Sequence, residues 1–116
     1  MTTVIDMIRN DYKAFQTSEM ADSVQDFFND THLSHFPVLE KDDFMGSLSH
    51  NDAETFSFDK EINQYKYTFE SFHASPEIEL LELLQIFARH QTDVVPVLDE
   101  KNKYLGYFEI QDIIRI

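Results

Sequence analysis

Histidines are the first residues of this sequence whose chemistry could serve a site, because imidazole binds transition metals. His32 and His35 lie three positions apart, yet no helix or strand pattern aligns them with a third ligand at a recognisable spacing. They fall where the pattern predicts a loop that leads into a strand. We therefore interpret them as surface side chains and expect no metal site. The same interpretation applies to His50, His73 and His90.

Catalytic groups are equally hard to assemble from the sequence. The carboxylate pairs Asp42–Asp43 and Asp99–Glu100 fall in predicted hairpin turns, where acidic residues favour the turn, whereas a general acid or base needs an enclosing pocket. The chain has no cysteine, and its two glycines are too few for a glycine-rich phosphate loop. The sequence therefore predicts a protein that is not an enzyme.

The chain repeats itself, and an internal repeat determines the architecture. Residues 35–52 match residues 94–112, each with Pro-Val-Leu, an acidic turn, a glycine and an aspartate in that order. The matching prolines are 59 positions apart, and the only two glycines, Gly46 and Gly106, are 60 apart. This coincidence indicates a duplicated structural unit.

A helix is expected before each copy. Apolar residues recur at helical spacing over residues 21–28 and again over residues 80–87. The first helix is predicted to begin near Thr17 or Ser18. The second is predicted to begin at Ser75, a good N-cap residue that is followed by proline.

Each helix is followed by a strand, a tight hairpin, a second strand and a short final helix. With a strand before the helix, the unit is β-α-β-β-α, so we predict a mixed α/β (α+β) fold of two tandem units that share one core. The first unit is expected over residues 1–54, a connection over 55–65, and the second unit over 66–116.

These units resemble CBS repeats, and the chain is similar to the paired form known as a Bateman module. The resemblance rests on two copies of an apolar helix, Pro-Val-Leu, an acidic turn, and a glycine with an aspartate six positions later. It implies that the repeats pack sheet to sheet with pseudo-twofold symmetry. It also implies a homodimer formed through the repeat helices, and clefts between the repeats that bind adenosine-containing ligands.

The resemblance also assigns ligand roles to residues of both repeats. Ser49 and Asp52 fit the hydroxyl and carboxylate positions of the first repeat, where the carboxylate accepts the ribose hydroxyls, and Asp112 is the matching aspartate of the second. Glu109 takes the hydroxyl position of the second repeat, where its charge repels a phosphate. The residues expected to line the base pockets are Phe36, Pro37, Val95 and Pro96.

Structural interpretations compete with these roles. Phe36 and Val95 also fit as core residues where each repeat enters a buried strand. Asp52 and Asp112 also fit as caps, or as favourable charges at the starts of the final helices. The sequence leaves both interpretations open.

Composition limits the partners. The net charge of −13 at pH 7 disfavours nucleic acids and anionic membranes. With only nine basic residues, a nucleoside or monophosphate is easier to hold than a polyphosphate, which would need Mg²⁺. The absence of cysteine and of any apolar run of membrane-spanning length favours a cytoplasmic protein.

The first functional hypothesis is a regulatory, ligand-sensing module for an adenosine-containing metabolite such as AMP, ADP, ATP or another adenosyl compound. The alternative is a ligand-free module for dimerisation or protein interaction. Leu81 and Ile86, which widen the apolar face of the second helix, support the alternative. Either function requires a downstream domain or a partner protein to act upon.

Overall fold

The computed structural model describes residues 3–115 of the chain. In chain order, with η for a 3₁₀ helix, the elements are η1 (Ile5–Met7), β1 (Phe15–Gln16), α1 (Ala21–Thr31), β2 (His35–Glu40), β3 (Asp43–Ser49), α2 (His50–Ala53), η2 (Ile62–Thr68), α3 (Leu80–His90), β4 (Val94–Leu98), β5 (Tyr104–Glu109) and α4 (Ile110–Ile113).

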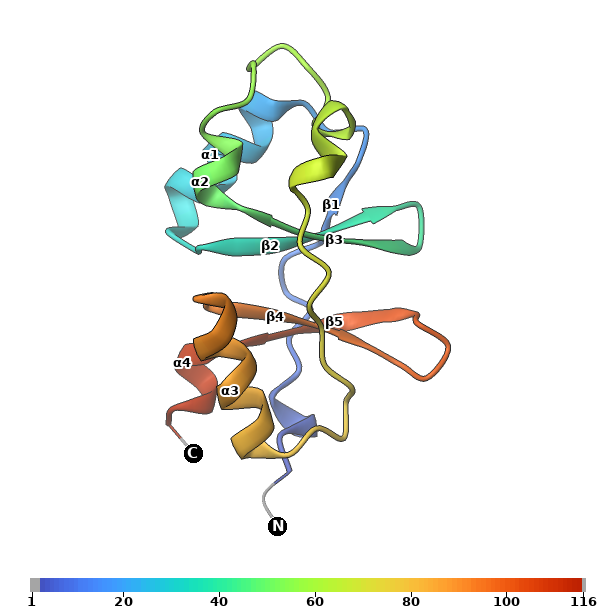
Figure 1. Ribbon diagram of the computed structural model, residues 1–116, viewed down its shortest axis with the longest axis vertical. Helices are drawn as coiled ribbons and strands as arrows, with labels where there is room; N and C mark the ends of the chain where they lie inside the picture. Colours follow the sequence, from blue (N-terminus) through green and yellow to red (C-terminus); the bar gives the residue numbers. More distant parts are fainter. Residues whose placement is uncertain (1–2, 116) are drawn as a thin grey trace.

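Two sheets face each other at the centre of the molecule, and the helices lie on their outer sides (Figure 1). One sheet has the strand order β1-β2-β3 and the other the order β4-β5. Strands β2 and β4 contact each other across the middle. The predicted fold class, two α/β units packed sheet to sheet, is confirmed.

The two units repeat each other in the register of their strands. The pairing shifts between Val38 and Leu39 in one hairpin and between Val97 and Leu98 in the other. The first strand differs between the units. β1 pairs in parallel with β2 over two residues, whereas in the second unit a single parallel bridge joins Ala74 to Val97. The predicted opening strand of the second unit is thus reduced to one bridge.

The first main helix begins later than its sequence pattern predicts. α1 begins at Ala21, and the predicted start at Thr17 or Ser18 is wrong. The backbone N–H of Thr17 donates to the Leu39 carbonyl at 3.0 Å, which continues the pairing of β1 with β2. The Thr17 carbonyl accepts from the backbone N–H of Asn63 at 2.9 Å, and the Ala21 N–H, which would donate to it in a helix capped by Thr17, donates to the Lys60 carbonyl at 2.8 Å.

The second main helix also begins late. α3 begins at Leu80, so the predicted start at Ser75 is wrong. The backbone N–H of Ile78 donates to the Ser75 carbonyl at 3.2 Å and closes a turn that contains Pro76. Serine followed by proline suits the first two positions of such a turn as well as it suits a helix start.

Two crossing segments tie the units together. Arg9, from the N-terminal segment, exchanges two backbone hydrogen bonds with Tyr107 of β5, at 2.8 and 3.0 Å. Glu70, from the segment between η2 and α3, exchanges two with Ser47 of β3, at 2.7 and 2.8 Å. Because Ser47 and Tyr107 are equivalent in the repeat, Arg9 and Glu70 occupy equivalent places in the two units.

The two glycines permit these close approaches. Gly106 has φ +142°, and a Cβ atom there would lie 2.3 Å from the Arg9 carbonyl oxygen. Gly46 has φ +122°, and its Cβ would lie 2.9 Å from the Glu70 carbonyl oxygen. Side chains are disfavoured in this backbone region and have no room here. The repeated glycine is therefore required by the crossing segments.

Each of the two hydrophobic cores also contains residues from the other half of the chain. Val94 of β4 and Tyr107 of β5 are buried in the cluster formed mainly by the first unit. Val4 of the N-terminal segment is buried in the cluster formed mainly by the second unit. Each core thus depends on residues from both halves of the chain, and this packing sets the position of Arg9.

Candidate ligand clefts between the two units

The four residues expected to line base pockets lie in buried strands. Phe36 and Val95 have 0% exposure. The Phe36 ring packs on Tyr107 with 5.1 Å between ring centroids. Pro37 and Pro96 are buried beside them. In this conformation all four side chains belong to the interior, and a ligand would contact them only after rearrangement.

Ser49 and Asp52 meet at the start of α2. The Ser49 hydroxyl accepts a hydrogen bond from the backbone N–H of Asp52 at 3.0 Å, so the serine caps the helix. Asp52 is partly exposed in the first turn. The structure brings Ser49 and Asp52 together, and the Ser49 hydroxyl serves as the N-cap of α2.

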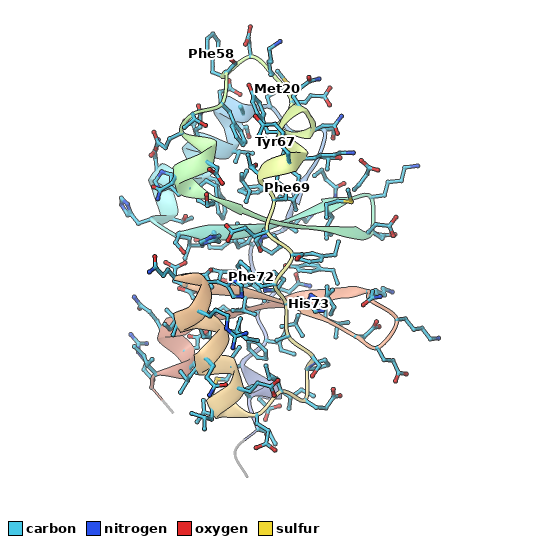
Figure 2. The ribbon with its side chains drawn as sticks, viewed as in Figure 1. Met20, Phe58, Tyr67, Phe69, Phe72 and His73 are labelled. Carbon is cyan, nitrogen blue, oxygen red and sulfur yellow. The ribbon has the colours of Figure 1, made fainter. Side chains whose placement is uncertain are left out.

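Aromatic side chains occupy the space beside Ser49. His35 pairs in register with Ser49, and its Nε2 lies 2.9 Å from the Glu70 carboxylate. The His35 ring packs edge-on against Phe72, which in turn stacks on His90 with 4.5 Å between centroids. Figure 2 shows Phe72 on the crossing segment at the level between the two sheets. The protein's own rings therefore fill this side.

Asp112 is held by an arginine from the opposite end of the chain. The Arg9 guanidinium donates two hydrogen bonds to the Asp112 carboxylate, from Nε at 2.5 Å and from Nη2 at 2.7 Å. Glu109 lies 3.6 Å from the same Nε. This two-pronged geometry is the strongest kind of carboxylate pairing. Each of the two Asp112 carboxylate oxygens therefore accepts a hydrogen bond from Arg9.

A pocket of about 280 Å³ lies beside this ion pair. Its lining consists of Arg9, Asp11, Tyr12, Asp30, Thr31, Leu33 and Glu109. It combines an apolar side chain, an aromatic ring that is 47% exposed, a hydroxyl and charged groups. Such a mixture can hold a flat base at one end and polar groups at the other.

The pocket is electrostatically uneven. The hydrogen bonds from Arg9 hold the pKa of Asp112 below its usual value. Burial raises the pKa of Glu109, and the nearby Arg9 offsets part of that rise. The Tyr107 hydroxyl donates to Asp11 at 2.8 Å and lowers the pKa of Asp11. Three carboxylates and one guanidinium line the space, so an anionic ligand must use Arg9.

This chain is similar to known proteins both in sequence and in fold. Residues 68–116 match the family model of the CBS domain. The CBS domains of a transcriptional regulator from Streptococcus pneumoniae superpose with a TM-score of 0.83 at 18% identity, over 100% of this chain and 99% of that chain. The chain folds as a CBS domain pair. This confirms the sequence-based resemblance.

Other solved CBS pairs have the same fold as this chain. A CBS domain pair/ACT domain protein from Thermotoga maritima has a TM-score of 0.84 at 18% identity, over 98% of this chain and 94% of that chain. CBSX2, solved in complex with AMP, has a TM-score of 0.79 at 15% identity, over 99% and 95%. A search among curated protein sequences found no match. At these identities the likeness concerns the fold.

Arg9, which lines the pocket and pairs with Asp112, is the candidate site residue that the sequence did not reveal in this CBS pair. No local pattern in the sequence indicates that Arg9, in the N-terminal segment, lies beside Asp112. The two side chains are 103 positions apart, and the contact depends on the crossing of the N-terminal segment onto β5. The one available signal was Gly106, whose missing side chain marks a close approach of another backbone.

Neither a metal site nor a membrane-spanning helix is found among the described residues. Within residues 3–115 of the CBS pair, no group of three or more histidine or acidic side chains is arranged to hold a metal ion. No helix in that range combines the length and apolarity needed to cross a membrane.

Proposed function

We propose that this CBS pair is a regulatory module that binds an adenosine-containing ligand, with AMP as the leading candidate, in the cleft beside Asp112. The observation that carries the proposal is the pocket lined by Arg9, the residue that holds Asp112. Its 280 Å³ lies just below the range of about 300–1,000 Å³ for small-molecule sites, which favours a mononucleotide over a larger ligand. The AMP complex of CBSX2 supports the ligand class.

Binding would exchange the partners of two charged groups. The two ribose hydroxyls donate to the Asp112 carboxylate, and Arg9, released from Asp112, turns to the ligand phosphate. Neither charge is left without a partner, which keeps the exchange energetically accessible. Tyr12 and Leu33 supply the contacts for the base.

The same exchange provides a route to regulation. Arg9 lies on the crossing segment that is hydrogen bonded to β5, so a change of its side-chain partner alters how the N-terminal segment is held. A ligand shifts a conformational equilibrium only by its different affinity for the two states. Here the two states are the one in which Arg9 pairs with Asp112 and the one in which Arg9 has turned away from Asp112.

The cleft beside Asp112 is a better candidate than the one beside Asp52. At the equivalent position near Ser49, Phe72 stacks on His90 and His35 contacts Glu70. A base would have to displace these rings. In addition, Glu70 occupies the place that Arg9 has in the other cleft, so a phosphate would meet a negative charge there instead of a positive one.

Calorimetric titration with AMP and with adenosine tests the proposal. AMP should bind the native protein, and Asp112→Asn should weaken binding by about tenfold or more, because hydrogen bonds to a charged group are lost. Arg9→Gln should remove the preference for AMP over adenosine. Asp52→Asn is the matched control and should leave the affinity unchanged.

The opposite pattern would contradict this site. Loss of AMP binding in Asp52→Asn with retention in Asp112→Asn would move the ligand to the first cleft. If AMP fails to bind the native protein, the regulatory site proposed beside Asp112 is wrong for this ligand class.

A second candidate function, a ligand-free dimerisation module, is favoured by a different observation. Leu81 on α3 is 69% exposed, and Ile114, directly after α4, is 66% exposed. The two helices are neighbours on one side of the molecule (Figure 1). Analytical ultracentrifugation at micromolar concentration should then show a dimer that Leu81→Glu dissociates. A monomeric native protein would contradict this function.

A further inference from the structure

A second pocket lies on the other side of the N-terminal segment. Its volume is about 560 Å³, twice that of the pocket beside Asp112. Apolar side chains of β1, α1 and β2 line it together with Tyr104 of β5 and two lysines. The two pockets share no lining residue. This larger space is therefore not part of the proposed nucleotide site.

The apolar wall of the second pocket is aromatic. Phe15 and Phe27 contact each other edge to face with 5.1 Å between ring centroids, and Leu39 lies beside them. Phe15 is only 3% exposed, so the wall belongs to the packed core and is fixed. An aromatic ring packs favourably against such a surface.

Tyr104 adds a polar group without a partner. Its hydroxyl is buried and forms no hydrogen bond with any residue in the described range 3–115. Burial raises the pKa of this hydroxyl, so it stays protonated and can donate. A buried donor without an acceptor is unfavourable, and a ligand acceptor would relieve this.

Two lysines, Lys13 and Lys41, line the pocket together with two carboxylates, Glu19 and Asp42. Within the described part of the chain, Lys13 and Lys41 have no ion-pair partner in a protein of net charge −13. The Gln16 side chain bonds to both the backbone N–H and the carbonyl of Lys41, at 2.9 and 3.1 Å, and so fixes its position. Glu19, which also lines the pocket, accepts from the Gln16 backbone N–H at 2.7 Å.

We propose that this pocket binds a small aromatic carboxylate. The ring lies against Phe15, Phe27 and Leu39, the carboxylate pairs with Lys13 and Lys41, and the Tyr104 hydroxyl donates to it. The CBS pair would then carry a second input that is independent of the nucleotide.

Amide NMR titration with phenylacetate, and with its neutral analogue phenylacetamide, tests this site. Phenylacetate should give saturable shifts at Phe15, Phe27 and Lys41, with an affinity about tenfold or more above that of the amide, because a charged pair is formed. The double variant Lys13→Gln/Lys41→Gln should reduce phenylacetate binding to the level of the amide. Tyr104→Phe, which keeps the ring, should also weaken it.

Lys101→Gln/Lys103→Gln is the matched control, since it removes the same charge from the hairpin of the other unit. It should leave phenylacetate binding unchanged, as should Asp112→Asn, so failure here is separate from failure of the nucleotide site. Absence of saturable shifts, equal binding of the amide, or an equal loss in the control variant would overturn the proposal.

Discussion

The two clefts of this CBS pair share one backbone design but differ in charge and openness. At equivalent places on the crossing segments, Arg9 pairs with Asp112, whereas Glu70 pairs with His35. The Arg9 side has a pocket, and the Glu70 side is filled by the stacked rings of Phe72 and His90. The repeat thus determines which positions face each cleft. The residue types at those positions determine the volume and the charge of the cleft.

The largest effect on stability is expected from substitutions of the two glycines that let the crossing segments approach the sheets. Gly106→Ala should lower the free energy of unfolding by about 3 kcal/mol and Gly46→Ala by about 2 kcal/mol, since both positions have positive φ and the first is more crowded. Urea denaturation followed by circular dichroism measures both. Equal, small losses would show that the crossing segments are not fixed by these glycines.

A smaller effect sharpens the contrast between the two aspartates. At pH 7, Asp112→Asn should cost about 1–2 kcal/mol, because it weakens a partly buried charged pair, whereas Asp52→Asn should cost about 0.5 kcal/mol. The folded-state pKa of Asp112 is lowered, so its contribution is present above the unfolded value of about 3.9 and is lost as pH falls through the folded pKa.

Urea denaturation at several pH values measures this. The difference between the native protein and Asp112→Asn should disappear in acid. A difference that persists at pH values where Asp112 is protonated would mean that the cost comes from packing rather than from the ion pair.

The smallest effect concerns Glu109, which stands where the first repeat has Ser49. Burial raises the pKa of Glu109, so its ionisation opposes folding as pH rises through the unfolded value of about 4.3 towards the folded pKa. Glu109→Gln should therefore stabilise the protein at pH 7 by about 0.5 kcal/mol and leave it unchanged in strong acid. Thermal unfolding measures this, with Glu61→Gln as control because the Glu61 side chain is exposed. Destabilisation at pH 7 would show that Glu109 supports Arg9.

Much of the fold was predictable because the two units share short local sequence patterns. Proline, glycine and aspartate recur at offsets of 59 and 60, and the paired hairpins follow them. The helix starts were mispredicted because Thr17 and Ser75 suit a strand end or a turn equally well. The limits of the units at 1–54, 55–65 and 66–116 stay a prediction.

The site was less predictable because its key contacts are non-local. Asp52 and Asp112 were identified from the repeat, yet no local pattern reveals that Arg9 reaches Asp112. Whether Phe36 and Val95 face a ligand or the core depends on how tightly two sheets pack, and a linear sequence does not specify that distance. The ligand roles of all seven predicted site residues stay predictions.

The most direct test of the account is an NMR titration with AMP that follows the Arg9 Nε–H signal together with the backbone amides. We predict that AMP shifts the Arg9 Nε–H signal and the amides of Thr31 and Leu33, while the amides of Ser49 and Phe72 in the other cleft stay unchanged. Shifts centred on Ser49 and Phe72, or an Arg9 Nε–H signal that AMP does not shift, would contradict the exchange at Asp112.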